Sequence, residues 1–254
     1  MIIKCISYTC KFSKKNNTFD NMTHSYDSED KLIVAVDCII FGFDAKEGLK
    51  ILLIRRRFEP KKGHWSLMGG FLKKNETLDE AAYRVLKKLT GLNQLHLEQL
   101  EAYSEVDRDP VERTISTAYS ALINTNKYDE ALLEQYEAQW FSVTKIPKLI
   151  FDHDQMVERA MRRLRSKATT QPIGLELLPE KFTMKQLQTL YETILGETLD
   201  KRNFIKKILS IDVLIKLEEK DMTSSKKGSY LYKFDLKKYD DKSKVNFFFN
   251  SIKF

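Results

Sequence analysis

Apolar residues recur along this chain with two periodicities, one typical of β-strands and the other of amphipathic helices. The runs 32–43 (LIVAVDCIIFGF) and 51–56 (ILLIRR) have strand length and are separated by a turn-like segment that contains a glycine. They predict an antiparallel hairpin. Three further strand-like segments follow at 97–107, 112–124 and 137–143.

Two helices are predicted among these strands. In the first, Thr77 and Glu80 form a capping-box pair ahead of a broad apolar face, and a glycine stands where helices commonly end. The second, at 151–168, has apolar residues at helical spacing and arginines toward its end. Its cap is expected to be Asp152 or Asp154.

A change in composition divides the chain into two predicted domains. TTQPIG, at 169–174, is rich in turn-forming residues and predicts a linker between a domain over 31–168 and another over 175–239. In the second domain a helix is expected from Thr183 and another over 200–212. Two short strands, VLIKL and YLYKF, then flank a polar loop. This is the order of a winged helix-turn-helix.

The two ends of the chain differ from these domains. Residues 1–30 are polar without sustained periodicity, so we expect a poorly ordered N-terminal arm. The tail, 240–254, carries three consecutive phenylalanines and is expected to dock on the body or on a second subunit. No run approaches the length of a membrane span. Cys5, Cys10 and Cys38 show no paired or metal-ligand spacing, which favours a reduced, cytoplasmic setting.

The 254 residues are 42% apolar and 31% charged, as is ordinary for a packed globular protein, and the net charge is +7. This charge is localised, because four of the seven residues at 201–207 are basic and none lies on the apolar side of the predicted helix. A solvated face is one interpretation. DNA recognition is favoured, since lysines neutralise phosphates while arginine and asparagine read bases. The candidate DNA contacts are Thr183, Lys185, Lys201, Arg202, Asn203, Lys206, Lys207, Lys226, Lys227 and Ser229.

The stretch 69–92, GGFLKKNETLDEAAYRVLKKLTGL, has the spacing of a Nudix box and resembles it in frame. A Nudix box carries metal-binding glutamates at three positions of its helix. Those positions are here Val85, Lys88 and Leu89. Because Mg²⁺ prefers carboxylate oxygens, these residues predict that the helix binds no metal and that the domain has no catalytic residues. Glu76 and Arg84 remain, and we expect them to hold the loop against the helix.

A binding pocket can persist without the reaction. Sugar sites combine carboxylates with aromatic rings, whereas nucleotide sites combine arginines with aromatic rings. Asp37 interrupts the first apolar run, so it is expected to meet an arginine or a hydroxyl donor, or to line a polar cavity. His64 and His153 show no metal spacing and are expected to be ordinary polar residues. The candidate effector contacts are Asp37, Arg55, Arg57, Trp65, Asp107, Arg108, Asp109, Arg113 and Tyr119, near the FDHD segment.

The run FTMKQLQTLYETILGETLDKRNF, together with the altered box, resembles the Nudix-related transcriptional regulators over roughly 32–239. The resemblance implies an α+β fold, a Nudix-like α/β/α sandwich followed by a winged helix-turn-helix. It also implies a homodimeric cytoplasmic repressor that needs no cofactor and binds double-stranded operator DNA and a small-molecule effector. WSLMGGF before the box and DRDP-x-x-R after it look closest to the branch that responds to sugars, notably arabinose, which implies control of carbohydrate metabolism.

Two other functions stay open. One is a Nudix hydrolase that acts on ADP-ribose or another nucleoside diphosphate derivative with relocated metal ligands, such as Glu76 with Glu80 or Glu105. The other is an interaction scaffold that binds no DNA. Mg²⁺-dependent release of phosphate or of a nucleoside monophosphate would favour the first. The second would be favoured if substituting the basic residues at 201–207 by alanine left DNA affinity unchanged.

Overall fold

The structure is a computed structural model that describes residues 29–91, 96–124, 134–223 and 227–242, without the side chains of 89, 90 and 240–242. The chain divides into two compact units, 1–31 and 32–254. In the first unit only residues 29–31 are described, and they are exposed. Most of the predicted N-terminal arm and of the C-terminal tail therefore lies outside the described residues. All described helices and strands belong to the second unit.

A seven-stranded sheet lies at the centre of the first domain of this unit. Its central strands, β1 (Ile33–Asp44) and β6 (Thr114–Asn124), run parallel. β2 (Gly48–Arg55) pairs antiparallel with β1, which confirms the predicted hairpin. The remaining strands are β3 (Trp65–Ser66) and β7 (Ala138–Ser142) on β2, β4 (Met68–Phe71) on β1, and β5 (Leu97–Tyr103) on β6.

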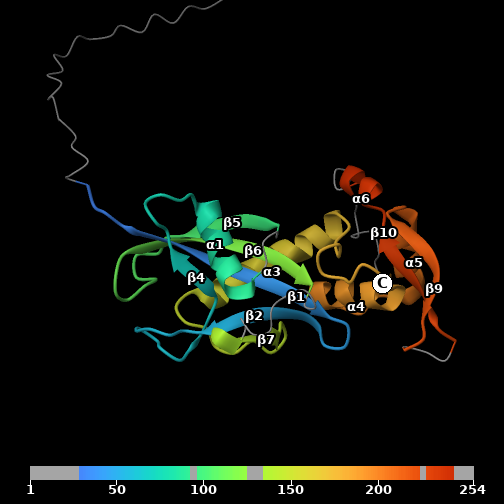
Figure 1. Ribbon diagram of the computed structural model, residues 1–254, viewed down its shortest axis with the longest axis horizontal. Helices are drawn as coiled ribbons and strands as arrows, with labels where there is room; N and C mark the ends of the chain where they lie inside the picture. The colour runs from blue at the N-terminus through green and yellow to red at the C-terminus, as the bar shows by residue number, and fades with distance from the viewer. Residues whose placement is uncertain (1–28, 92–95, 125–133, 224–226, 243–254) are drawn as a thin grey trace, which may run out of the picture. The chain divides into compact units, whose positions relative to one another are not determined.

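Side chains alternate between the two faces of β1, as they do along any strand. Ile39 and Phe41 enter an apolar core that includes the inner face of α3 (His153–Thr170). Cys38 enters a second core, which includes the apolar face of α1 (Leu78–Thr90). One helix therefore covers each face of the sheet, as Figure 1 shows. This is the predicted α/β/α sandwich.

α1 begins and ends as its sequence predicts. Thr77 Oγ1 accepts a hydrogen bond from Glu80 N at 3.2 Å, and Glu80 Oε2 accepts one from Thr77 N at 2.8 Å. These two bonds complete the capping box. Gly91 follows the last turn with a φ of 71°, the left-handed conformation that glycine adopts without strain.

α3 begins differently from its prediction. Asp152 stands at the N-cap position, but its side chain makes no capping bond because it accepts two hydrogen bonds from Arg108. Asp154 Oδ1 accepts from Leu149 N at 3.2 Å, and its other oxygen pairs with Lys148 Nζ at 2.6 Å. Neither predicted aspartate therefore caps the helix, since each is bound by a group outside it.

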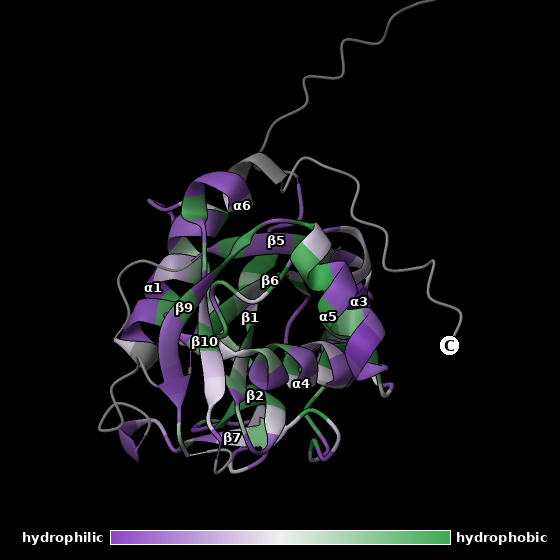
Figure 2. Ribbon diagram, turned by 90° about the vertical axis from the view of Figure 1, so that its right-hand side faces the viewer, coloured by the Kyte–Doolittle hydropathy of each residue, from purple (hydrophilic) through white to green (hydrophobic). Residues whose placement is uncertain are grey.

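The second domain contains two consecutive helices and a three-stranded sheet. Its elements are β8 (Phe182–Thr183), α4 (Met184–Leu195), α5 (Lys201–Ser210), β9 (Leu214–Asp221), β10 (Ser229–Phe234) and the short α6 (Leu236–Lys242). As predicted, Asp200 caps α5, accepting a hydrogen bond from Asn203 N at 2.8 Å. β9 and β10 form the expected hairpin. Figure 2 shows β9 in mainly hydrophilic colours, because lysines and acidic residues occupy most of its positions.

The segment 169–174, predicted as a linker, is partly helical and packed. α3 extends two residues into it, and Ile173 is buried, with its N–H donating to Tyr191 Oη of α4 at 3.0 Å. Arg165 Nε of α3 donates to Ile194 O of α4 at 3.0 Å. α4 is therefore attached to α3 through Arg165 and to the segment that follows α3 through Tyr191.

Candidate functional site

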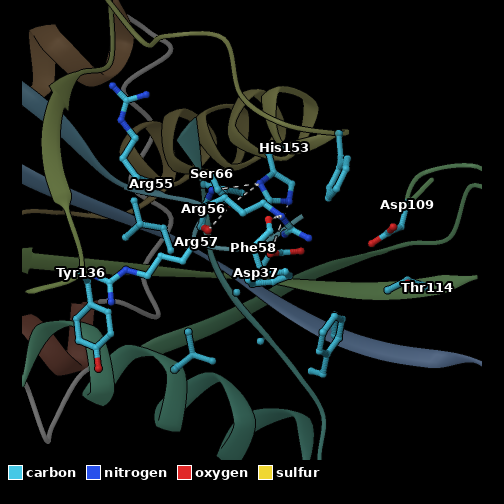
Figure 3. Close-up of a pocket in the computed structure, with 18 of the residues that line it drawn as sticks. Asp37, Arg55, Arg56, Arg57, Phe58, Ser66, Asp109, Thr114, Tyr136 and His153 are labelled. Carbon is cyan, nitrogen blue, oxygen red and sulfur yellow. Dashed lines mark hydrogen bonds and ion pairs between the residues drawn. The ribbon is translucent and has the colours of Figure 1, made fainter. Parts of the chain in front are cut away.

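A cavity of about 440 Å³ lies between the box helix α1, the end of β2, strands β1 and β4 and the start of α3. Its volume falls within the range of small-molecule sites. Figure 3 shows Asp37 and His153 near its centre and Asp109 on the side away from Arg57 and Tyr136. The charged and aromatic residues that line it are Arg55, Arg56, Arg57, Arg84, Lys88, Arg108, Asp37, Asp109, Phe58, Phe71, Tyr136, Phe151 and His153.

Asp37 is buried at the base of this cavity. Its Oδ2 accepts a hydrogen bond from Ser116 Oγ at 2.6 Å and lies 3.7 Å from Arg108 Nη2. Arg108 also donates to Asp152 through Nε at 2.9 Å and Nη2 at 2.8 Å. The expectation that Asp37 meets a hydroxyl and an arginine is thus confirmed. A carboxylate can remain buried here because these donors replace its lost hydration.

His153, the first residue of α3, is also buried beside Asp37. Its Nδ1 accepts a hydrogen bond from Leu67 N at 3.1 Å, so the neutral ring carries its proton on Nε2. That nitrogen lies 3.7 Å from Asp37 Oδ1. Burial lowers the pKa of His153 below its ordinary value, against the opposing effect of Asp37. The residue expected to be an ordinary polar side chain therefore fixes the start of α3 to the segment between β3 and β4.

Glu76 and Arg84 hold the glycine-rich loop to the box helix, as predicted. Arg84 Nε donates to Glu76 Oε2 at 2.8 Å, and Arg84 Nη2 donates to Phe71 O at 3.0 Å. Lys73 N donates to Glu76 Oε1 at 2.8 Å. The hydrogen bonds from Arg84 lower the pKa of the Glu76 carboxyl to about 2. Glu76 is thus an ionised structural partner of the arginine.

Besides Arg84 and Arg108, three consecutive arginines and one lysine bring positive charge to the cavity wall. The Cζ atoms of Arg55, Arg56 and Arg57 lie 3.9, 3.9 and 5.4 Å from the ring centres of Trp65, Phe58 and Tyr136. Lys88 Nζ lies 5.7 Å from the Tyr136 ring centre. Among the described residues, none of these four cations has a carboxylate within ion-pair distance. The arrangement favours an anionic ligand with an aromatic or apolar part.

Five of the nine predicted effector residues line the cavity, namely Asp37, Arg55, Arg57, Arg108 and Asp109. The other four do not. Trp65 lies under Arg55 and packs edge-on against Phe141, with ring centres 4.7 Å apart. Asp107 is exposed in the turn that precedes β6.

Arg113 and Tyr119 serve the scaffold around the cavity. Arg113 donates to the carbonyls of Ser104 and Glu105 at 2.9 and 3.1 Å and thereby closes the loop between β5 and β6. Tyr119 is buried, and its hydroxyl donates to Asp79 Oδ1 at 2.6 Å, which ties β6 to the first turn of α1. Their polar groups are already occupied by protein.

Sequence reasoning did not select many residues of the lining as effector contacts, among them Arg56, Phe58, Tyr136, Phe151 and His153. Arg56 and Phe58 stand beside selected arginines in the same RRRF run, so adjacency was an available signal. The FDHD segment was noted for its hydrogen-bonding and stacking groups, and it supplies Phe151 and His153. Tyr136 had no local signal, because it reaches the cavity from a distant part of the sequence.

The residues of the box do not fit a divalent cation. Val85 is 4% exposed, and a Cβ built on Gly70 would lie 2.9 Å from its Cγ2, so this part of the wall is filled by hydrocarbon. Lys88 adds an ammonium, and the Leu89 side chain lies outside the described residues. Glu76 is held by Arg84. Within the described part of the chain no three His, Cys, Asp or Glu side chains gather as metal ligands.

α5 presents a polar face beside its buried residues. Lys201, Arg202, Asn203 and Lys206 are exposed, and Lys207 is half-buried. In the described residues Lys201, Arg202 and Lys206 form no ion pair, so their charges are available to a ligand.

Two predicted contacts lie at the start of α4. Thr183 is buried, and its hydroxyl accepts a hydrogen bond from Gln186 N at 3.2 Å, so it caps the helix. Lys185 is exposed on the first turn.

The hairpin between β9 and β10 adds further cations. Lys227 is exposed and Ser229 is half-buried at the start of β10, while Lys226 lies outside the described residues. Two lysines of β9 that were not predicted flank an exposed aromatic ring: Lys216 Nζ and Lys220 Nζ lie 3.7 and 4.7 Å from the ring centre of Tyr230.

Comparison with known proteins identifies both domains. Residues 31–160 match the model of the NUDIX domain, and residues 174–234 match that of the NrtR DNA-binding winged helix domain. The chain is 34% identical over 214 residues to the ADPR-responsive transcriptional repressor NtrR of Acinetobacter baylyi, covering 82% of this chain and 84% of that protein. The chain belongs to the Nudix-related transcriptional regulators.

Two other matches place this regulator among known proteins. Shewanella oneidensis NrtR, solved in complex with a 27mer DNA, superposes with a TM-score of 0.71 and 27% identity, over 82% of this chain and 95% of that one. The ADP-ribose pyrophosphatase of Methanocaldococcus jannaschii is 38% identical over 129 residues, covering 51% of this chain and 73% of that enzyme. The predicted family and fold class are confirmed, whereas these three relatives give no support to a sugar as the effector. None of the described helices is long and apolar enough to cross a membrane.

Proposed function

We propose that this Nudix-related regulator is an ADP-ribose-responsive repressor that binds operator DNA as a homodimer. The observation that carries the proposal is the cavity wall, in which Arg55, Arg56, Arg57 and Lys88 lie beside aromatic rings and, among the described residues, have no carboxylate within ion-pair distance. ADP-ribose combines an anionic diphosphate with an adenine ring and two riboses. Arginines suit the diphosphate and aromatic rings suit the base.

This effector replaces the sugar that the sequence favoured. A neutral pentose has no charge to set against these cations, and desolvating them without compensation opposes binding. The similar repressor of Acinetobacter baylyi is named for its response to ADP-ribose. Asp37 and Asp109, which also line the cavity, supply carboxylate oxygens that can accept hydrogen bonds from ribose hydroxyls.

The DNA-binding part of the proposal rests on α5. Lys201, Arg202 and Lys206 are exposed without ion pairs among the described residues, and Asn203 lies on the same polar side. Lysines at these positions neutralise phosphates, while Arg202 and Asn203 are suited to base edges. In a symmetric dimer the two α5 helices would enter successive major grooves about 34 Å apart.

Hydrolysis of the effector is not part of the proposal. Glu76 pairs with Arg84, Glu80 completes the capping box with Thr77, and Lys88 stands where a metal ligand is required. Without a bound metal there is no Lewis acid to activate water or to polarise the phosphoryl oxygen. Release of AMP from ADP-ribose in the presence of Mg²⁺ or Mn²⁺ would instead place the protein with the pyrophosphatase that it resembles.

The effector is tested by thermal unfolding of the full chain with ADP-ribose, AMP, ribose 5-phosphate and arabinose. A ligand at a hundred times its Kd stabilises the folded state by about 2.7 kcal/mol, which is readily measured as a shift in Tm. We expect ADP-ribose to give the largest shift. A shift with arabinose and none with ADP-ribose would restore the sugar and overturn this choice.

DNA binding is tested by fluorescence anisotropy with a duplex from upstream of the protein's own gene. Lys206→Ala is expected to weaken binding and to reduce the slope of log K against log salt by about one. Lys145→Ala, which removes an exposed lysine far from α5 in sequence, is the control. ADP-ribose is expected to release the wild-type protein from the duplex. Equal affinities for the two variants and the wild type would refute the assignment of α5.

A further inference from the structure

Lys88 projects from the box helix into the cavity wall. It is exposed and lines the cavity, and its Nζ lies 5.7 Å from the ring centre of Tyr136. Val85, one turn earlier on the same side of α1, is 4% exposed and closes the wall against Gly70. In a metal-binding box these two positions carry carboxylates. At this point the cavity has an ammonium and a hydrocarbon surface in their place.

Arg57, which follows β2, contacts the same aromatic ring as Lys88. Its Cζ lies 5.4 Å from the ring centre of Tyr136, and its Nη2 donates to Gln135 O. Figure 3 shows Arg57 extending toward Tyr136. Two cations from two different elements therefore converge on one ring. In the described residues neither has a carboxylate within ion-pair distance, so an anion bound beside both would offset their positive charge.

We propose that Lys88 and Arg57 hold the diphosphate of the effector directly, with Lys88 supplying the positive charge that a divalent cation supplies in a metal-binding box. This inference rests on the proposed function, because it requires a nucleoside diphosphate ligand. Binding then needs no Mg²⁺. It is weakened by Mg²⁺, because an ion bound to the phosphates of the free ligand competes with these two side chains.

The replacement separates recognition from reaction. An ammonium neutralises phosphate charge and donates hydrogen bonds, but it does not bind a water molecule as a Lewis acid and convert it to a nucleophile. Lys88 thus retains the electrostatic attraction of the site and removes the chemistry. A regulator built in this way responds to the concentration of the effector without consuming it.

The test is isothermal titration of the full chain with ADP-ribose in excess EDTA and again in excess MgCl₂. Lys88→Met removes the charge, and Lys88→Glu returns a carboxylate to the position. Lys87→Met is the matched control, because Lys87 is the adjacent exposed lysine of the same helical turn and does not line the cavity. The melting temperature and the DNA affinity of each variant without ligand verify that it is folded.

Wild type is expected to bind more tightly in EDTA than in MgCl₂. Lys88→Met is expected to lose about tenfold or more in affinity, the value of a charge-assisted hydrogen bond, while Lys87→Met stays within about twofold. Lys88→Glu is expected to lose more in EDTA and to recover part of the loss in MgCl₂.

Wild-type binding that disappears in EDTA, or Lys88→Met binding equal to that of wild type, would overturn the role of Lys88 and leave ADP-ribose as the effector. A folded wild-type protein that binds no ADP-ribose under either condition would overturn both the role of Lys88 and the proposed function. The two failures are therefore distinguishable in one set of titrations.

Discussion

Replacing Arg108 by methionine tests the buried charges that hold the cavity to α3. The Arg108 side chain is 4% exposed, and its guanidinium donates two hydrogen bonds to Asp152 and lies 3.7 Å from Asp37. Methionine fills a similar volume but carries no charge. In Arg108→Met both carboxylates remain in place, and Asp152 loses both of the donors that its side chain has in the wild type.

The expected cost follows from the burial of these groups. Breaking a buried ion pair by removing one partner costs about 3–5 kcal/mol, because the other charge is left without compensation. The cost is expected at the lower end of this range, since Asp37 keeps the hydroxyl of Ser116 at 2.6 Å and only Asp152 is stripped of its donors. For a chain of this length each kcal/mol lowers Tm by roughly 2–4 °C, so a fall of roughly 6–12 °C is expected.

The assays are thermal unfolding for the Tm and urea unfolding for the free energy, both at neutral pH and followed by tryptophan fluorescence. Arg113→Met is the control, because Arg113 lies in the same loop and donates only to backbone carbonyls; its loss is expected to be smaller, about 1–2 kcal/mol. Adding Asp152→Asn to Arg108→Met removes the stranded charge while keeping a favoured N-cap residue, and it is expected to restore about 2 kcal/mol. The reasoning is wrong if Arg108→Met costs no more than Arg113→Met, or if the double variant is no more stable than the single one.

Three other changes give separate predictions. Because burial lowers the pKa of His153, its imidazole stays neutral in the folded state, whereas in the unfolded chain it binds a proton below its ordinary pKa of 6.5. The free energy of unfolding is therefore expected to fall below that pH by up to about 1.4 kcal/mol per pH unit. Urea unfolding of His153→Gln is expected to show a weaker fall. Glu76, with a pKa lowered to about 2 by Arg84, stabilises the fold above its ordinary pKa of 4.5, and acid titration of Glu76→Gln is expected to lack the stability loss between these two values. Gly48→Ala is expected to cost about 1–3 kcal/mol in thermal unfolding, because φ is +78° and the new Cβ would lie 2.6 Å from Thr193 Oγ1.

The parts of the fold that sequence predicts are those set by neighbouring residues. Thr77 and Glu80 bond to each other across one turn, and Asp200 caps α5 through Asn203 N, so short spacing was enough to place both helices. Asp152 shows where this reasoning fails. It has the position of a cap, but Arg108, 44 residues earlier, binds its side chain more strongly than the helix terminus does.

The cavity was harder to predict because its wall is assembled from distant segments. Arg57 donates to Gln135 O across 78 residues, and no local pattern connects the two. The chosen arginines indicated that a pocket exists. Its ligand was inferred instead from short motifs beside the box, which favoured a sugar. The three consecutive arginines and Lys88, which among the described residues have no carboxylate within ion-pair distance, favour a diphosphate. Charge balance depends on which carboxylates meet which arginines, and spacing along a chain does not contain that information.

α3 connects the cavity with the DNA-binding domain. At its first residue, His153 is bound to Leu67 N beside the cavity, and 12 residues later Arg165 is bound to Ile194 O of α4, about 18 Å away at 1.5 Å per residue. A helix of this length moves as a stiff element, so a shift at the cavity also moves Arg165. An effector changes DNA affinity only if it binds one position of α3 more tightly than the other. A preference of about 1.4 kcal/mol then alters operator affinity tenfold. Under the proposed function the altered box has two physical roles, to retain the effector and to leave it intact, and α3 is the element through which effector binding would change the placement of α4.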